Sequence, residues 1–121
     1  EVIEGKRQTH QFYYVREQAE VKAKLFKQAL SDIDIAIYLA PDETSFKAEK
    51  ASLQLRLNLI SEAMQTAEQC VKEAPDYSDG YLILGLAQIN SGKKEEGLAN
   101  LDKAKNLGNS QATSLIEKYK K

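Results

Sequence analysis

The chain has few of the residues that support metal binding, covalent cross-links or nucleophilic catalysis. Its 121 residues include one cysteine, one histidine and no tryptophan. A single cysteine, Cys70, excludes an internal disulfide. Metal sites usually combine several histidine, cysteine or carboxylate ligands, and His10 lies near the N-terminus without such a pattern. We therefore expect a surface histidine, no metal and no cofactor.

Long apolar runs and a strong charge imbalance are also missing. No apolar run approaches the roughly 20 residues needed to cross a bilayer, and residues 1–10 lack the apolar core of a signal peptide. The formal net charge of −1 disfavours a nucleic-acid partner. We expect a soluble protein of the cytoplasm or periplasm that does not insert into membranes. Charge is uneven, since residues 41–80 carry eight acidic and four basic groups.

A repeat of 34 residues organises the chain. The only two prolines, Pro41 and Pro75, stand 34 residues apart. Three series of small residues recur at this spacing, with alanine, glycine or cysteine at each position: Ala29, Ala63 and Gly97; Ala36, Cys70 and Ala104; Ala40, Ala74 and Gly108. Small residues seven apart lie on one helix face and let neighbouring helices approach closely. Cys70 is therefore interpreted as a buried packing residue and not as a nucleophile.

The same spacing predicts where helices end. Proline ends each second helix because it lacks an amide hydrogen and disfavours helical dihedrals in the preceding residue. Asn58 and Gly92 tolerate the left-handed conformation of a turn within each repeat. Ser61 is a candidate N-cap for the helix that follows Asn58, and Asp42, Thr44 or Ser45 for the helix that follows Pro41. The predicted helices are 9–24, 27–40, 44–57, 61–74, 78–91, 94–106 and 110–120.

These residues resemble a known family. The segment 81–87, Tyr-Leu-Ile-Leu-Gly-Leu-Ala, followed by Gly92, Gly97, Leu101 and Ala104, is similar to a tetratricopeptide repeat (TPR). The second halves of the two earlier repeats, 28–41 and 62–75, resemble the second helix and closing proline of that family. The first repeat departs from the pattern, because Arg16 and Glu17 replace a Leu-Gly pair. Lys47 replaces an aromatic residue, and Asn109 stands where the third repeat would have its proline.

The resemblance implies an all-α fold, a right-handed superhelix of antiparallel helix pairs with about seven helices. It divides the chain into an N-terminal extension (1–9), three repeats (10–43, 44–77 and 78–111) and a C-terminal capping helix (112–121), all within one domain. Residues 112–121 carry an apolar helix face that would cover the last repeat. The closing stretch 107–119 looks like the ends of many bacterial repeat proteins, which suggests a bacterial source.

In this family, ligands usually lie in a concave groove lined by the first helix of each repeat. Carried over by position, the partner-binding groove would contain Tyr14, Gln18, Val21, Glu49, Ser52, Leu55, Arg56, Asp79, Leu82, Ile83, Leu86, Ile89 and Asn90. The apolar members on residues 79–90 could equally be buried against the terminal helix. Members that hold the C-terminal carboxylate of chaperones use lysine, asparagine and arginine at five positions, which here are Tyr14, Gln18, Glu49, Asp79 and Ile83. None matches, so we expect a groove outside this chaperone-tail subclass.

The resemblance therefore predicts a scaffold or adaptor whose groove binds a peptide or helix of another protein. The alternative is a self-associating or positioning module of a larger protein or assembly, in which Phe12, Tyr13 and Tyr14 would form contacts at the N-terminal end. Catalysis is not expected, because the sequence shows no set of polar residues that would converge on one active site. Asp32 and Asp34 are two apart on one helix and point in different directions, which does not suit an acid–base pair.

Overall fold

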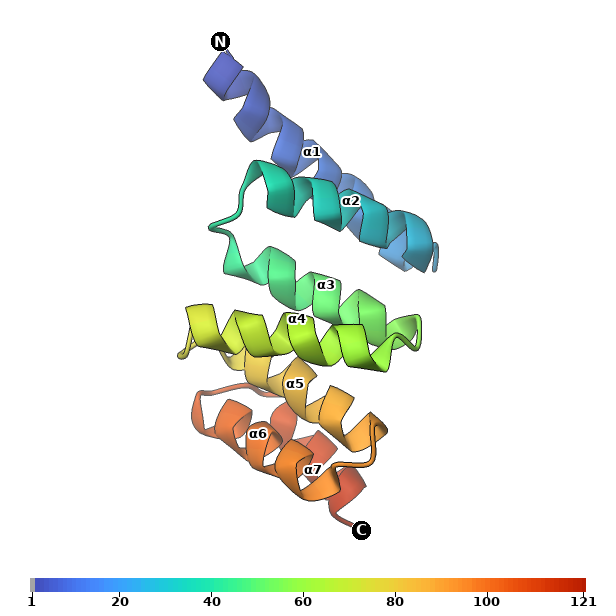
Figure 1. The fold of residues 1–121 in the computed structure, drawn as a ribbon, viewed down its shortest axis with the longest axis vertical. Coiled ribbons are helices and arrows are strands. Elements are labelled where there is room, and N and C mark those ends of the chain that lie inside the picture. Colours follow the sequence, from blue (N-terminus) through green and yellow to red (C-terminus); the bar gives the residue numbers. More distant parts are fainter. Residues whose placement is uncertain (1) are drawn as a thin grey trace.

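The computed structural model describes the backbone of residues 2–121 and the side chains of residues 10–121. Over this range the chain is all-α, with seven helices stacked along the long axis of the molecule (Figure 1). They are α1 (Val2–Lys22), α2 (Phe26–Leu39), α3 (Thr44–Arg56), α4 (Ile60–Glu73), α5 (Ser78–Asn90), α6 (Lys94–Asn106) and α7 (Ala112–Lys120). The predicted helices agree except at the first, which begins at Val2. Residues 2–9 of the predicted extension therefore continue α1, and Glu1 lies outside the described residues.

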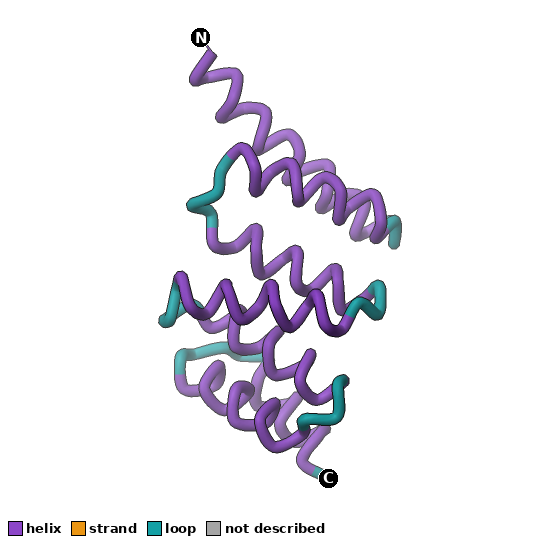
Figure 2. The backbone as a smooth tube through the Cα atoms, in the orientation of Figure 1, coloured by secondary structure: helices purple, strands orange, loops and turns teal. Residues whose placement is uncertain are grey.

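Consecutive helices pack as antiparallel pairs. The pairs α1 and α2, α3 and α4, and α5 and α6 form the most extensive contacts, while α2 packs on α3 and α4 on α5 to join successive pairs. Short loops link consecutive helices alternately on the two lateral sides of the stack (Figure 2). The first helix of the second pair, α3, also contacts the first helix of the third, α5. The first helices thereby share one side of the stack.

A residue in the left-handed backbone conformation lies in the turn inside every helix pair. Asn58 has a φ of 63° and Gly92 a φ of 94°, as predicted, and Lys24 occupies the equivalent place with a φ of 61°. After each of them, a backbone N–H reaches back to a carbonyl five residues earlier at 2.8 Å: Leu25 to Glu20, Leu59 to Gln54 and Lys93 to Gln88. This hydrogen bond satisfies a carbonyl at the helix end. The 34-residue period therefore extends to single hydrogen bonds.

The predicted N-caps are wrong. α3 begins after Glu43 and α4 after Leu59, and neither helix receives a hydrogen bond from a side-chain cap. The turns fix these helix starts instead, because the N–H groups of Ala63 and Phe46 bond to the carbonyls of Leu59 and Glu43. The helix breaks after Leu39 and Glu73, two residues before each proline, agree with the prediction.

Small residues fill the helix crossings, as the spacing predicts. Ala29, Ala36, Ala63, Cys70 and Ala104 are fully buried. In the third pair the approach is closest. A Cβ on Gly85 would lie 2.7 Å from the carbonyl oxygen of Gly97, a distance shorter than normal contact. Close packing of backbones therefore requires glycine at this crossing.

The first pair carries ionisable residues at the same crossing. Glu17 occupies the position of Ala51 and Gly85, and it is fully buried. Its neighbour Arg16 forms a two-pronged ion pair with Asp32 of α2, with N···O distances of 2.8 and 2.7 Å. This arrangement explains why α1 departs from the Leu-Gly pattern of the repeat.

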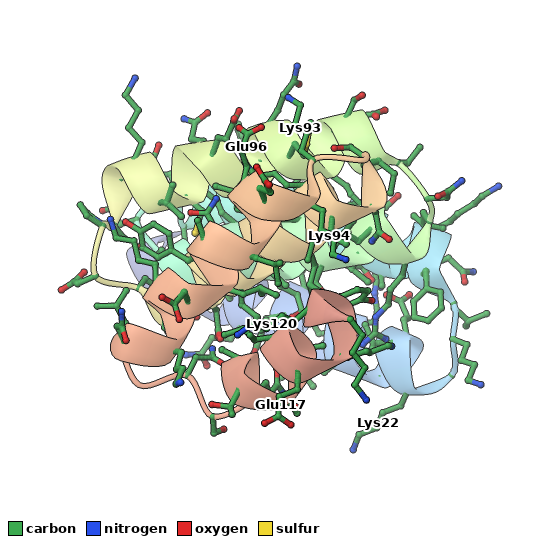
Figure 3. All side chains as sticks on the ribbon, turned by 90° about the horizontal axis from the view of Figure 1, so that it is seen from below. Lys22, Lys93, Lys94, Glu96, Glu117 and Lys120 are labelled. Carbon is green, nitrogen blue, oxygen red and sulfur yellow. The ribbon has the colours of Figure 1, made fainter. Side chains whose placement is uncertain are left out.

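α7 covers the last pair. Ala112 is fully buried in a cluster with Leu101 and Ala104, and Leu115 and Ile116 pack against it. The opposite side of α7 is polar, and Glu117 and Lys120 are exposed there (Figure 3). The helix therefore closes the apolar end of the stack, as expected of a capping helix. Among the described residues, no helix is both long enough and apolar enough to cross a membrane.

Candidate binding groove

A groove of about 540 Å³ runs along the side of the stack formed by the first helices. One residue of α1, four of α3 and the N-terminal half of α5 line it, and the loop between α6 and α7 closes one side. Its lining consists of Tyr14, Ser45, Ala48, Glu49, Ser52, Tyr77, Ser78, Asp79, Leu82, Ile83, Gly108, Asn109, Ser110 and Gln111. No residue of α2, α4 or α6 takes part. The volume lies in the range of ligand-binding clefts in proteins.

Two tyrosines and a largely buried leucine shape the groove. Tyr14 packs against the ring of Phe46, with ring centroids 5.0 Å apart and planes tilted by 32°. The hydroxyl of Tyr77 donates to Asp79 across 3.3 Å. Leu82 lies in the floor and is only 4% exposed. Because these side chains are held by neighbours, the walls of the groove are largely preformed.

Asn109 anchors the loop between α6 and α7 to the start of α5. Its Nδ2 donates to Asp79 at 2.8 Å and to Ser78 at 3.2 Å. Its Oδ1 accepts the backbone N–H of Gln111 at 3.0 Å. A proline at this position, as in the two earlier repeats, could make none of these bonds. The residue that breaks the repeat therefore places a polar loop on the edge of the groove.

The groove is electrostatically negative. Its lining includes the carboxylates of Glu49 and Asp79, and none of the lining residues is lysine or arginine. Burial and then the charge of Glu49 raise the pKa of Tyr14 above the usual tyrosine range. Burial and then the charge of Asp79 raise the pKa of Tyr77 to about 12. Both phenols therefore stay neutral at physiological pH, and no lysine or arginine in the lining balances the two carboxylates.

A second carboxylate lies behind Glu49. Glu17 is fully buried, and Gln18 bridges it to Glu49 with N···O distances of 2.7 Å and 3.4 Å. The Oε2 atom of Glu17 has no donor among the described residues. Burial and a hydrogen bond to Glu49 raise the pKa of Glu17 to about 8. Glu17 is therefore mostly protonated near neutral pH, and its proton can be donated to Glu49.

The structure brings together about half of the predicted groove residues. Those that line the groove are Tyr14, Glu49, Ser52, Asp79, Leu82 and Ile83. Gln18 lies beside it through its contact with Glu49. Four of the five positions that would hold a chaperone carboxylate, all except Gln18, thus face one another around a single groove.

The other predicted residues lie elsewhere. Val21 packs against the core of the first pair, and Leu86 and Ile89 pack against the cluster that includes Ala112 of α7. The apolar wall of α5 is thus partly explained by burial against the terminal helix. Leu55 is half-buried and does not line the groove. The remaining two are exposed: Arg56 lies over the ring of Phe26, 5.3 Å from its centroid, and Asn90 ends α5.

Sequence reasoning missed Tyr77, Ser78 and the loop residues Gly108–Gln111. The available signal was Asn109 itself, since a polar residue in place of the closing proline marks a loop with a different role. Tyr77 gave a weaker signal, because it precedes the predicted start of its helix by one residue.

The described residues contain no group of three or more histidine, cysteine, aspartate or glutamate side chains arranged to hold a metal ion. His10 packs edge-on against Phe46, with centroids 6.1 Å apart. Cys70 is buried, and burial raises the pKa of its thiol. Asp32 pairs with Arg16 on α1 and Asp34 with Lys50 on α3, so the two carboxylates point apart as predicted.

Comparisons with known proteins agree with this architecture. No protein-family model matches the chain. A curated relative, the small glutamine-rich tetratricopeptide repeat-containing protein 2 of Saccharomyces cerevisiae, is 27% identical over 95 residues, which is 78% of this chain. The chain spans only 28% of the length of that protein.

Solved TPR structures superpose closely. The Arabidopsis OM64 TPR domain has a TM-score of 0.87 at 19% identity, with 95% of this chain and 97% of that chain covered. The first TPR of Spaghetti (RPAP3), bound to the HSP90 peptide SRMEEVD, gives 0.84 at 19% identity, covering 93% and 91%. The TPR2B domain of yeast Sti1, in a complex with pHsp70, gives 0.85 at 17% identity, covering 93% and 97%.

The chain therefore has the fold of a tetratricopeptide-repeat domain, with seven helices over the described residues that correspond to three repeats and a capping helix. The prediction of a bacterial source gains no support from these similarities, which include yeast and plant proteins.

Proposed function

We propose that the chain is a scaffold that binds a segment of another protein in the groove lined by Tyr14, Glu49, Ser52, Asp79 and Ile83. The observation that carries the proposal is a preformed groove of about 540 Å³ on the side of the first helices. The hydroxyl and amide groups along it can hydrogen-bond to a peptide backbone, while Leu82 and Ile83 provide apolar contact.

The groove is chemically unsuited to an acidic chaperone tail. Two of the similar structures hold peptides that end in Glu-Glu-Val-Asp, from HSP90 in one and HSP70 in the other. In this chain, Glu49 and Asp79 line the groove, and none of the lining residues is lysine or arginine. The carboxylates of an acidic tail placed in this groove would be repelled by Glu49 and Asp79, and no ion pair would offset the cost of desolvating them. We infer that the partner lies outside that subclass.

Site-specific photo-crosslinking tests the groove as the binding surface. A photoreactive phenylalanine analogue replaces Ser52, which lines the groove, or Gln65, which is exposed on α4. In native extract we expect a discrete adduct from position 52 and none of the same mass from position 65. Identical adducts from both positions, or an adduct from 65 alone, would place the interaction elsewhere.

A second candidate function is self-association or docking to a larger assembly through the N-terminal end. Two large apolar side chains on α1 favour it, because Phe12 is 55% exposed and Val15 is 66% exposed. Figure 1 shows the first turns of α1 extending beyond α2. Sedimentation of the double variant Phe12→Ser/Val15→Ser tests this role. If the wild type is monomeric at millimolar concentration, self-association is excluded.

A further inference from the structure

The groove described above has a definite charge, and this charge restricts the kind of partner. Glu49 enters it from α3 and Asp79 from the start of α5, so the two carboxylates come from different repeats. Asp79 is held by the Nδ2 of Asn109 at 2.8 Å, and Glu49 is approached by Gln18 at 3.4 Å. Both neighbours are neutral. Among the described residues, neither carboxylate forms an ion pair with a lysine or arginine.

The cations nearest in sequence point away from the groove. Lys47 pairs with Glu73, and Lys50 pairs with Asp34 of α2 at 2.7 Å. Arg16 pairs with Asp32 on the far side of α1. These ion pairs engage Arg16, Lys47 and Lys50, the basic residues of α1 and α3 that lie closest in sequence to the groove lining. A ligand must therefore bring its own positive charge to neutralise Glu49 and Asp79.

The aromatic walls suit the stem of a basic side chain. The rings of Tyr14 and Tyr77 both line the groove, and their phenols are neutral. Lysine and arginine bury their methylene stems on apolar surface while the cationic head reaches a polar partner, and aromatic faces attract cations. Ser52 remains as a neutral hydrogen-bonding group for a peptide backbone.

We propose that the groove recognises an extended segment of a partner protein that carries lysine or arginine, with the cationic head between Glu49 and Asp79. This inference rests on the proposed function, because it specifies the ligand of the same groove. The side chain lies against Tyr14 and Tyr77, and charge-assisted hydrogen bonds to the two carboxylates fix its end. The recognition is opposite in sign to that required for an acidic C-terminal tail.

Fluorescence anisotropy with two matched probes tests the charge preference. One probe is a labelled eight-residue peptide of alternating lysine and alanine, and the other has glutamate in place of lysine. We expect the lysine peptide to bind at least about tenfold more tightly than the glutamate peptide at low salt, and to weaken as ionic strength rises. Equal binding of both peptides, tighter binding of the glutamate peptide, or no binding of the lysine peptide would overturn the proposal.

A pair of double variants separates the groove from general surface charge. Glu49→Gln/Asp79→Asn removes two charges and keeps the oxygen atoms that Gln18 and Asn109 contact. Glu62→Gln/Glu68→Gln removes two exposed charges from α4, which does not line the groove. We expect the first variant to lose about tenfold or more in affinity for the lysine peptide and the second less than twofold. Equal losses would overturn the inference, provided that circular dichroism shows both variants folded.

The crosslinking experiment at Ser52 keeps this inference distinct from the proposed function. If an adduct forms at position 52 and its crosslinked segment contains no lysine or arginine, the charge preference is wrong while the groove function stands. If no groove adduct forms and position 65 captures the partner, the groove function itself is wrong.

Discussion

Replacing Glu17 by glutamine should stabilise the fold at pH 8 and do so much less at pH 5. Glu17 is buried at a helix crossing where the other two repeats carry Ala51 and Gly85. Burial first, and then Glu49, raise its pKa from 4.5 to about 8. Glutamine has almost the same shape as a protonated glutamate. It can still accept from Gln18 and donate to Glu49.

The sign of this pH dependence follows from the number of protons that the folded and unfolded states bind. An exposed glutamate in the unfolded chain loses its proton near pH 4.5, whereas Glu17 in the folded chain keeps it up to about pH 8. Between these values the folded state binds more protons, so its stability falls as pH rises. Each tenfold change in proton affinity corresponds to about 1.4 kcal/mol, which sets an upper limit of about 5 kcal/mol. Because water in the adjacent groove can relax the buried charge, we expect about 2 kcal/mol.

Urea unfolding of wild type and Glu17→Gln at pH 5, 6.5 and 8 measures the effect. The free energy of unfolding of the variant should exceed that of the wild type by about 2 kcal/mol at pH 8 and by less than about 1 kcal/mol at pH 5. Glu68→Gln on α4 is the matched control, because Glu68 is exposed. A difference that does not change with pH, or a variant less stable than wild type at pH 8, would refute the reasoning.

Four further changes test the packing, the turn, the loop and the thiol. Gly85→Ala should lower the free energy of unfolding by about 1–3 kcal/mol, because its Cβ would meet the carbonyl of Gly97 at 2.7 Å; an unchanged urea midpoint would contradict the close crossing. Lys24→Gly should raise it by about 0.5–1 kcal/mol, because Lys24 has a φ of 61°, and a loss of stability would argue against this turn. Asn109→Ala should speed hydrogen exchange in the loop before α7, because three hydrogen bonds are lost; unchanged exchange would show that other contacts hold the loop. Cys70 should resist Ellman's reagent until the protein unfolds, since the thiol is buried, and rapid reaction of the native protein would contradict this.

The sequence was most informative where the 34-residue period repeats a packing requirement. Series such as Ala29, Ala63 and Gly97 must be small wherever two helices cross, so both the helix pairs and their stacking were predictable. The turns followed for the same reason at Asn58 and Gly92. Lys24 was missed there because lysine is not a residue type that signals a left-handed turn.

The first repeat could not be predicted from the pattern. Arg16 and Glu17 break the Leu-Gly pair, and their roles depend on Asp32 and Glu49, which come from other helices. Only the folded structure shows that an ion pair and a buried carboxyl group occupy the crossing. Long-range pairings of this kind leave no periodic trace in the sequence.

The groove was predictable in position but only in part in composition. Residues carried over from the first helices met at Tyr14, Glu49 and Asp79. The far edge comes from the loop between α6 and α7, where Asn109 replaces a proline. Residues such as Leu86 share the helix of the groove but face α7, because a helix that is apolar on several sides packs against more than one neighbour.

Chemical-shift mapping with the lysine peptide tests the central claim most directly. Titration of the ¹⁵N-labelled protein should shift the backbone amide signals of Tyr14, Ser52, Asp79 and Asn109, which come from four separate segments around one groove. Signals from α4, such as that of Gln65, should stay in place. Shifts confined to α4 or to the N-terminal end of α1, with the groove unaffected, would contradict the account.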